Sequence, residues 1–319
     1  MTNNIWYDNF LDMLYKKCPK KNQLVEELVD LLLIEREAVY RRLRQDVMFS
    51  ANEVIKIASA WNISLDKFVN NDKISFLMHP INYFQPSEDD FEYLKGTVKM
   101  LQQLKNSTEP SEYMEVCNRI PRPLNTGFAY IYKFYMFKWA YQYGAEHETI
   151  PYSKVEMTED MLNVASEYYA AIRNVTTTNY VFDYNVFKYF LRDVQYFHSI
   201  NLITDEEKEL IKNDLRALLD DLMAIAVNGY FPTTQNTVNI YISRINIDTN
   251  YSYFDSENLK VFRIHTFNKY EIKTYEDDLV IKFKNWTQLN KRSAVQISAV
   301  DEKSRIDFFN KQHHLIDMA

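Results

Sequence analysis

Glycine and cysteine are scarce in this chain. Only 4 of its 319 residues are Gly, which disfavours nucleotide-binding folds built on glycine loops and β architectures with many tight turns. The two cysteines, Cys18 and Cys117, are too few for a disulfide framework and are typical of a reducing compartment. We therefore expect a cytoplasmic protein held together by packed cores, for which an apolar content of 46% is ample.

Segments that would direct the chain into a membrane are not recognisable either. The N-terminus, MTNNIWYDNF, has no basic region followed by an apolar run, so we expect no signal peptide. The most aromatic stretch, residues 130–143, is interrupted by Lys133 and Lys138 and is too short to span a bilayer. The sequence thus predicts no membrane partner.

Sequence patterns of enzymes and metal sites are missing as well. The chain has no phosphate loop, no Rossmann glycine fingerprint, no paired-cysteine zinc spacing and no His-Glu-x-x-His. His198 lies among apolar residues and is expected to be a hydrogen-bonded core residue, while the adjacent His313 and His314 would face different ways on a helix. The sequence therefore predicts no catalytic residue, no metal site and no cofactor. No group of residues in it supports an enzymatic function.

Charge is distributed unevenly along the chain. The net charge is −7, yet residues 1–75 carry 11 Lys/Arg and 11 Asp/Glu, so the acidic excess lies downstream. An N-terminal region can be locally basic and contact nucleic acid while an acidic remainder stays away from it. A length of 319 residues also favours two or three domains over one.

The stretch at residues 28–43, LVDLLLIEREAVYRRL, predicts two short helices with a tight joint near Leu33. Val39 and Leu43, at i and i+4, give the second helix an apolar side. A short helix on a hydrophobic bed, with a basic and aromatic outer face, is what the major groove of DNA admits. The outward face of this helix carries Arg36, Tyr40, Arg41 and Arg44.

This stretch resembles the helix-turn-helix of phage-repressor-like (Cro/repressor-type) transcription regulators. Val29, Leu33 and Val39 occupy the places where that family has a small residue, a turn glycine and an apolar residue. Residues 49–53, FSANE, form a capping box that opens the next helix. The resemblance covers about residues 5–70, which is under a quarter of the chain.

The resemblance implies that the protein binds double-stranded DNA. Residues 35–44 would enter the major groove, with Arg36, Tyr40 and Arg41 nearest the bases. Further basic residues are expected to reach the phosphates, which position a protein without reading sequence. These are Arg42 and Arg44 of the same helix, with Lys20 and Lys21 at the start of the preceding one.

Beyond residue 72 the pattern changes twice. Residues 73–87 are expected to form a packed connector, and residues 88–228 five helices around one aromatic core. After Pro232, alternation at positions such as Val238 and Ile240 predicts strands, followed by two helices and one further strand. The expected fold class is mainly α, with a helix-turn-helix domain at 1–72, an aromatic-rich helical domain at 73–230 and a small α+β unit at 231–319.

Two functional hypotheses follow. The first is a DNA-binding transcription regulator whose C-terminal region senses a small-molecule or protein effector, or brings two chains together as a homodimer. The surfaces expected for pairing are the strands at 238–264 and a terminal helix with Phe308 and Phe309. The second is a protein-interaction scaffold with a degenerate helix-turn-helix that does not bind DNA, which Leu33, Glu35 and Glu37 favour. A purely structural helix, however, has no need of four arginines within nine residues.

Overall fold

The computed structural model describes residues 5–61, 63, 65, 68, 77–78, 86–143, 150–266 and 270–319. The chain divides into two compact units, Met1–Leu77 and Met78–Ala319. The first boundary expected from the sequence, at residue 72, lies outside the described residues. Each unit has a hydrophobic core of its own.

The first unit is a small bundle of helices. Apolar side chains recur along its helices at helical spacing and are buried, such as Leu24 and Leu28 of α2 and Val39 and Leu43 of α3. The two helices expected within residues 28–43 are confirmed. The described helices of this unit are α1 (Ile5–Lys17), α2 (Lys21–Leu32), α3 (Arg36–Leu43) and α4 (Ala51–Ala60).

The joint between α2 and α3 is made at Leu33, where φ is 57° and ψ is 44°. This is the left-handed region in which helices commonly end, usually at a glycine. The Leu33 side chain is 85% exposed, so it adds little to the core. The capping box expected at α4 is present, because the Ser50 side chain accepts from Glu53 N and the Glu53 carboxylate accepts from Ser50 N.

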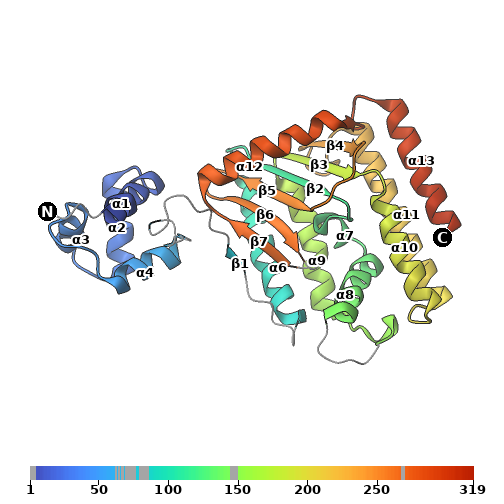
Figure 1. Ribbon diagram of the computed structural model, residues 1–319, viewed down its shortest axis with the longest axis horizontal. Coiled ribbons are helices and arrows are strands. Elements are labelled where there is room, and N and C mark those ends of the chain that lie inside the picture. The colour runs from blue at the N-terminus through green and yellow to red at the C-terminus, as the bar shows by residue number, and fades with distance from the viewer. Residues whose placement is uncertain are drawn as a thin grey trace. The chain divides into compact units, whose positions relative to one another are not determined.

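The second unit is built on a mixed β-sheet (Figure 1). Among the described residues its strand order is β1-β7-β6-β5-β2-β3-β4-β8. β3 pairs in parallel with both β2 and β4. The pairs β2–β5, β5–β6, β6–β7 and β4–β8 are antiparallel. The strands are β1 (Leu77–Met78), β2 (Glu112–Cys117), β3 (Thr177–Asp183), β4 (Thr237–Ser243), β5 (Tyr251–Asp255), β6 (Lys260–Thr266), β7 (Tyr270–Thr274) and β8 (Ala294–Gln296).

Helices lie against both faces of this sheet (Figure 1). On one face α12 packs on β5 and β6, where the Phe283 ring stacks on Phe262 with centroids 4.0 Å apart. On the other face lie α6, α7 and α9, and α11 continues this layer by contacting β4, α8 and α13. The described helices of this unit are α6 (Pro86–Gln103), α7 (Arg122–Asn125), α8 (Ala129–Tyr143), α9 (Glu159–Ala171), α10 (Val186–Ser199), α11 (Asp205–Asn228), α12 (Asp277–Asn290) and α13 (Glu302–Met318).

Helices predominate among the described residues, as expected, but the prediction that residues 88–228 form only helices is wrong. β2 and β3 lie within that range and are central strands of the sheet. Nearly every residue of both strands is buried, because helices cover the sheet on both faces. Strands buried on both sides show no polar–apolar alternation, which is the pattern that predicted β4.

The boundary expected at residue 230 is wrong for the same reason. β4 pairs with β3 over its whole length, so residues 78–319 form one unit rather than a helical domain and a separate α+β domain. The surfaces expected to join two chains are also interior. β4, β5 and β6 each have a neighbouring strand on both sides, and Phe308 and Phe309 are buried in the core.

Candidate functional site

The outer face of α3 carries the basic residues expected to read DNA, and acidic residues accompany them. Arg36 Nη1 lies 2.7 Å from Glu26 Oε1, and Arg44 Nη2 lies 2.9 Å from Glu37 Oε1. All four side chains are about half exposed or more, so water screens these pairs and a competing anion can replace either carboxylate. Arg41 is exposed and forms no ion pair with another described residue.

Arg42 is placed differently from the other arginines of α3. Its Nε and Nη2 donate to the two oxygens of Glu53, at 3.0 and 2.8 Å, and its Nη1 donates to the Ala38 carbonyl. The Arg42 and Glu53 side chains are only 19% and 14% exposed. The guanidinium therefore binds α3 to α4, and the structure gives no support to the phosphate contact that the sequence predicted for it.

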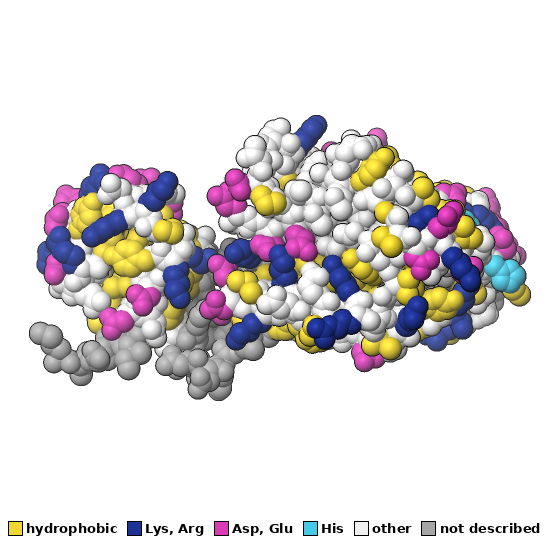
Figure 2. Space-filling model, turned by 90° about the horizontal axis from the view of Figure 1, so that it is seen from above, with side chains coloured by type: hydrophobic (Ala, Val, Ile, Leu, Met, Phe, Trp, Pro, Cys, Tyr) yellow, Lys and Arg dark blue, Asp and Glu magenta, His cyan; other side chains and the backbone are white. Residues whose placement is uncertain are grey.

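The lysines expected at the phosphates lie at the start of α2, beside α3. Lys20 is the residue preceding α2, and no side chain caps that helix end. The Lys21 ammonium lies 6.0 Å from the centre of the Tyr40 ring, within range of a weak cation–π contact. The start of α2 and the outer face of α3 consequently form one continuous surface. Figure 2 shows Lys/Arg and Asp/Glu interspersed on the displayed face of this unit, not a solid basic patch.

A second candidate site, which the sequence did not predict, lies in the second unit. The strand register places one row of side chains across the covered face of the sheet, because residues in register share a face. The row runs from Lys273 on β7 through Arg263 and Ser252 to Glu115 on β2 and Tyr180 on β3. His265 and Glu271 face each other one step along β6 and β7. A face that ought to be apolar beneath helices is therefore strongly polar.

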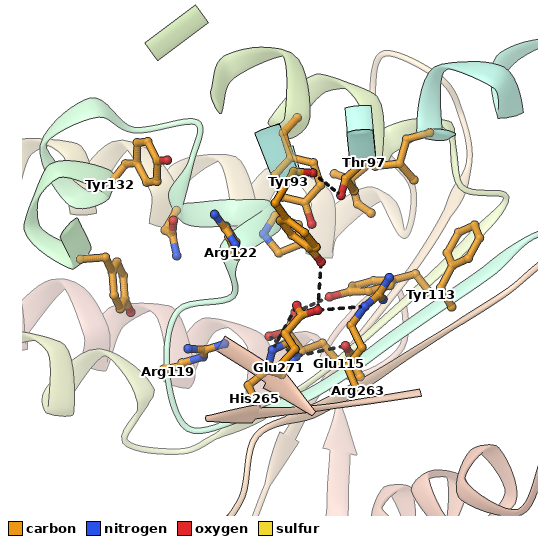
Figure 3. Close-up of a pocket in the computed structure, with 18 of the residues that line it drawn as sticks. Tyr93, Thr97, Tyr113, Glu115, Arg119, Arg122, Tyr132, Arg263, His265 and Glu271 are labelled. Atoms are coloured by element: carbon orange, nitrogen blue, oxygen red, sulfur yellow. Dashed lines mark hydrogen bonds and ion pairs between the residues drawn. The ribbon is translucent and has the colours of Figure 1, made fainter. Parts of the chain in front are cut away.

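Helices and a loop close this row into a cavity of about 60 Å³ (Figure 3). α6 supplies Tyr93 and Thr97, and α9 supplies Tyr168. Arg119 and Arg122 come from the segment that follows the carboxyl end of β2, the end at which α/β sheets commonly bind ligands. In Figure 3 the Tyr93 hydroxyl points down from α6 toward Glu271, and Arg119 lies to the side of the same carboxylates.

The charged side chains of the cavity form a connected network. Glu271 Oε2 accepts a hydrogen bond from the Tyr93 hydroxyl at 2.9 Å and lies 3.3 Å from Arg263 Nε. Glu271 Oε1 lies 3.7 Å from His265 Nδ1, and His265 Nε2 is 3.0 Å from the Ser252 hydroxyl. Glu115 Oε2 accepts from the Tyr113 hydroxyl. Carboxylates, arginines and tyrosine hydroxyls thus meet in a space that is largely closed to water.

Burial shifts the protonation of these groups. Burial, together with the positive charge of Arg119, lowers the pKa of His265 to about 3, so its ring is neutral at pH 7. Burial raises the pKa of Glu115. Burial also acts to raise the pKa of Glu271, but Arg263 and other nearby cations outweigh it and leave that pKa below its usual value. With His265 neutral, three arginines and two carboxylates are the charged groups among the described residues that line the cavity.

The sequence contains a pattern that belongs to this cavity, but that pattern normally indicates a solvent-exposed face. Arg263 and His265 alternate with apolar residues in β6, as Glu271 and Lys273 do in β7. Charge at every second position of a strand normally indicates a face in contact with water, so nothing marked these residues as neighbours of Arg119. Only the helices that cover the sheet convert this polar face into a site.

Within the described residues, no group of three or more His, Cys, Asp and Glu side chains is arranged to hold a metal ion. None of the described helices is both long and apolar enough to cross a membrane. Comparisons of the chain with protein-family models, with curated proteins and with solved structures found no match.

Proposed function

We propose that this protein is a DNA-binding regulator. The first unit contacts double-stranded DNA through the outer face of α3 and the start of α2. The second unit senses an effector or joins two chains. The resemblance of residues 5–70 to phage-repressor-like helix-turn-helix regulators supports this proposal, as do the described helices α1 to α4, whose order and short connections suit it.

The observation that carries the proposal is the contact between Lys21 and Tyr40. It joins exposed lysines at an uncapped helix start to the exposed face of the next helix. The free N–H groups and partial positive charge of a helix start favour a phosphate. Arg41, Arg36 and Tyr40 on the adjoining face are side chains of the kind that reach base edges in the major groove.

We assign different roles to the basic residues of this surface. Arg36 and Arg41 would face the bases, where a bidentate arginine–guanine pair adds about 1–3 kcal/mol of discrimination. Lys20, Lys21 and Arg44 would contact phosphates. Arg42 is left out of the DNA-contacting set, because its guanidinium is held by Glu53 and the Ala38 carbonyl.

The acidic residues beside these arginines favour a second candidate function, a protein-interaction scaffold. Glu26 pairs with Arg36, and Glu37 with Arg44, and both carboxylates would stand near DNA phosphates and repel them. A surface of mixed charge with the exposed apolar side chain of Leu33 suits a protein partner of complementary charge.

Binding of the full chain to short duplexes of random and genomic sequence separates the two functions. A DNA-binding protein should bind at low salt and lose affinity steeply as salt rises, because phosphate contacts release counterions. If the intact protein has no affinity for duplex DNA even at low salt, the DNA-binding proposal is wrong and the scaffold is favoured.

Variants then test the assigned roles. Arg41→Ala should reduce discrimination between sequences by about tenfold or more, whereas Lys20→Ala should weaken binding to all sequences alike and reduce the salt slope by about 1. Lys56→Ala is the control, since Lys56 is an exposed cation on α4, outside α2 and α3. Equal losses of DNA affinity in all three variants would indicate that DNA is attracted only nonspecifically by the positive charges of the protein.

A further inference from the structure

We propose that the cavity between the sheet and helices α6, α7 and α9 binds a small oxyanion that also carries a hydroxyl group. Hydrogen phosphate and a short hydroxycarboxylate share this chemistry. Binding at this cavity is independent of DNA. Only its role as the effector site of a regulator rests on the proposed function.

The charge of the cavity calls for an anion. Three arginines, Arg119, Arg122 and Arg263, line it against two carboxylates, Glu115 and Glu271. Guanidinium groups in a space of low dielectric interact strongly with any anion that reaches them. An oxyanion among the arginines would accept hydrogen bonds from guanidinium groups, which are well matched to carboxylate and phosphate.

Tyrosines supply further donors around the same space. Burial raises the pKa of Tyr93, of Tyr113 and of Tyr168 above the usual value of a phenol, so these hydroxyls stay protonated at any physiological pH. Tyr93 and Tyr113 presently donate to the cavity's own carboxylates. A ligand oxyanion entering beside those carboxylates would offer alternative acceptors to these hydroxyls.

The need for a hydroxyl group comes from an acceptor that the protein leaves open. Asn125 Nδ2 donates to the Ile120 carbonyl at 3.2 Å, which fixes the orientation of the amide. Asn125 Oδ1 is buried and has no hydrogen-bond partner within the described part of the chain, and the same holds for Glu115 Oε1. Leaving a buried acceptor unpaired is unfavourable, so a ligand that can donate to it gains affinity.

The size of the cavity limits the ligand. A buried water occupies roughly 10–15 Å³ of such space, so a cavity of about 60 Å³ holds a few waters or a molecule of similar size. Tetrahedral phosphate and two-carbon hydroxy acids are of this size. A nucleotide or a sugar phosphate is not, unless the walls move.

A path to this cavity leads past two of its own side chains. Arg119 and Tyr135 line both this cavity and a neighbouring one of about 340 Å³, whose walls include Asn118, Lys138 and Arg192. Lys138 pairs with Asp193 in the wall of the outer cavity. Arg119 and Arg192 add positive charge there, which would attract an anion toward the inner cavity. Movement of the Arg119 and Tyr135 side chains is therefore the simplest route of entry.

The alternative is a purely structural network of buried charges, which also perturbs pKa values. Removing any member of such a network lowers stability without creating or abolishing a binding event. If the cavity is a binding site, replacing an arginine and replacing a carboxylate should change anion affinity in opposite directions. Arg122→Gln removes a positive charge and should weaken anion binding, while Glu115→Gln removes a competing carboxylate and should strengthen it.

The test is anion binding by the full chain in the absence of DNA, measured by calorimetry and by thermal shift at constant ionic strength. The probes are phosphate against sulfate and glycolate against acetate, because each pair differs in a hydroxyl group. We expect phosphate, glycolate or both to bind and to raise the unfolding midpoint, since a ligand of the folded state must do so. Which of the two binds identifies the head group. Sulfate and acetate should bind more weakly, and if they bind equally well the assignment of a hydroxyl group is wrong.

Three variants complete the experiment. Arg122→Gln should weaken binding about tenfold or more, the usual cost of a lost hydrogen bond to a charged group, and Glu115→Gln should tighten it. Arg292→Gln is the matched control, because Arg292 is exposed and is not among the residues that line the cavity. If no probe binds, or if binding persists unchanged in Arg122→Gln and Glu115→Gln, the inference is overturned. Arg41→Ala should leave anion binding intact, so failure of the DNA proposal and failure of this one are distinguishable.

Discussion

The Arg42 guanidinium forms a two-pronged hydrogen-bonded ion pair with the Glu53 carboxylate, at 3.0 and 2.8 Å. Glu53 also closes the capping box of α4 by accepting from Ser50 N. One carboxylate thus ties the C-terminal part of α3 to the first turn of α4. The orientation of α3, and with it the exposed face of Arg36, Tyr40 and Arg41, depends on this contact.

The first prediction concerns this ion pair. Arg42→Gln should lower the stability of the first unit by about 2 kcal/mol, because hydrogen bonds to charged groups contribute about 1.5–3 kcal/mol. Hydrogen exchange of the full chain, resolved by peptides, should show roughly 30-fold faster exchange in α3 and α4, at 1.4 kcal/mol for each factor of ten.

Two further variants serve as controls for this prediction. Glu53→Gln should cost a similar amount, since a glutamine can still close the capping box and loses only the ion pair. Arg41→Gln, next to Arg42 but exposed, should leave exchange unchanged. Equal exchange in Arg41→Gln and Arg42→Gln would show that the Arg42–Glu53 pair does not hold the two helices together.

The second prediction concerns the strained joint before α3. Leu33 adopts the left-handed conformation, which costs a residue with a Cβ atom roughly 1–2 kcal/mol. Its exposed side chain contributes little packing, so Leu33→Gly should stabilise the first unit. The net gain should be about 0.5–1 kcal/mol, because glycine also loses more entropy on folding.

Slower hydrogen exchange in α2 and α3 of Leu33→Gly would confirm this stabilisation. The matched control is Leu33→Ala, which removes the side chain but keeps the Cβ atom and should not be stabilised. A loss of stability in Leu33→Gly would mean that the Leu33 side chain makes a favourable contact that outweighs the backbone strain.

The third prediction is a pH dependence that arises from His265. Its folded-state pKa of about 3 lies below the usual value near 6.5. At pH values between these two, His265 is protonated in the unfolded chain and neutral in the folded chain. The stability that depends on a neutral His265 is complete above pH 6.5 and is lost as the pH falls. Going from pH 7 to pH 5 should cost about 2 kcal/mol.

Urea unfolding at several pH values, followed by the near-ultraviolet circular dichroism of the tyrosine-rich second unit, measures this loss. His265→Gln should lack it, because glutamine does not titrate. Glu115, whose pKa is raised, and Glu271, whose pKa is lowered, titrate in both proteins and so largely cancel in the comparison. An identical pH dependence in the two proteins would exclude His265 as its source.

Much of the local structure could be predicted from the sequence, because local interactions determine it. The Ser50–Glu53 capping box begins α4 as expected. Alternating apolar residues predicted β4, and the segments that form β5 and β6 were also expected to be strands. Helical spacing of apolar residues likewise predicted α2 and α3. It also placed the arginines on the outer face of α3, and the structure then separated Arg42 from the others.

Only the tertiary structure decided the rest. β2 and β3 could not be predicted, because helices and neighbouring strands bury them on all sides and remove the alternation that marks a strand. The cavity depends on the same layering, because its charged residues come from two stretches that are far apart along the chain. Glu115, Arg119 and Arg122 belong to the first stretch, and Arg263 and Glu271 to the second. The sequence by itself determined that these side chains are polar and that Arg263 lies in an expected strand. That the polar face of the sheet lies beneath α6 and α9 rather than in water follows from how the strands order themselves in the sheet, and that ordering turns ordinary surface charge into a candidate anion site.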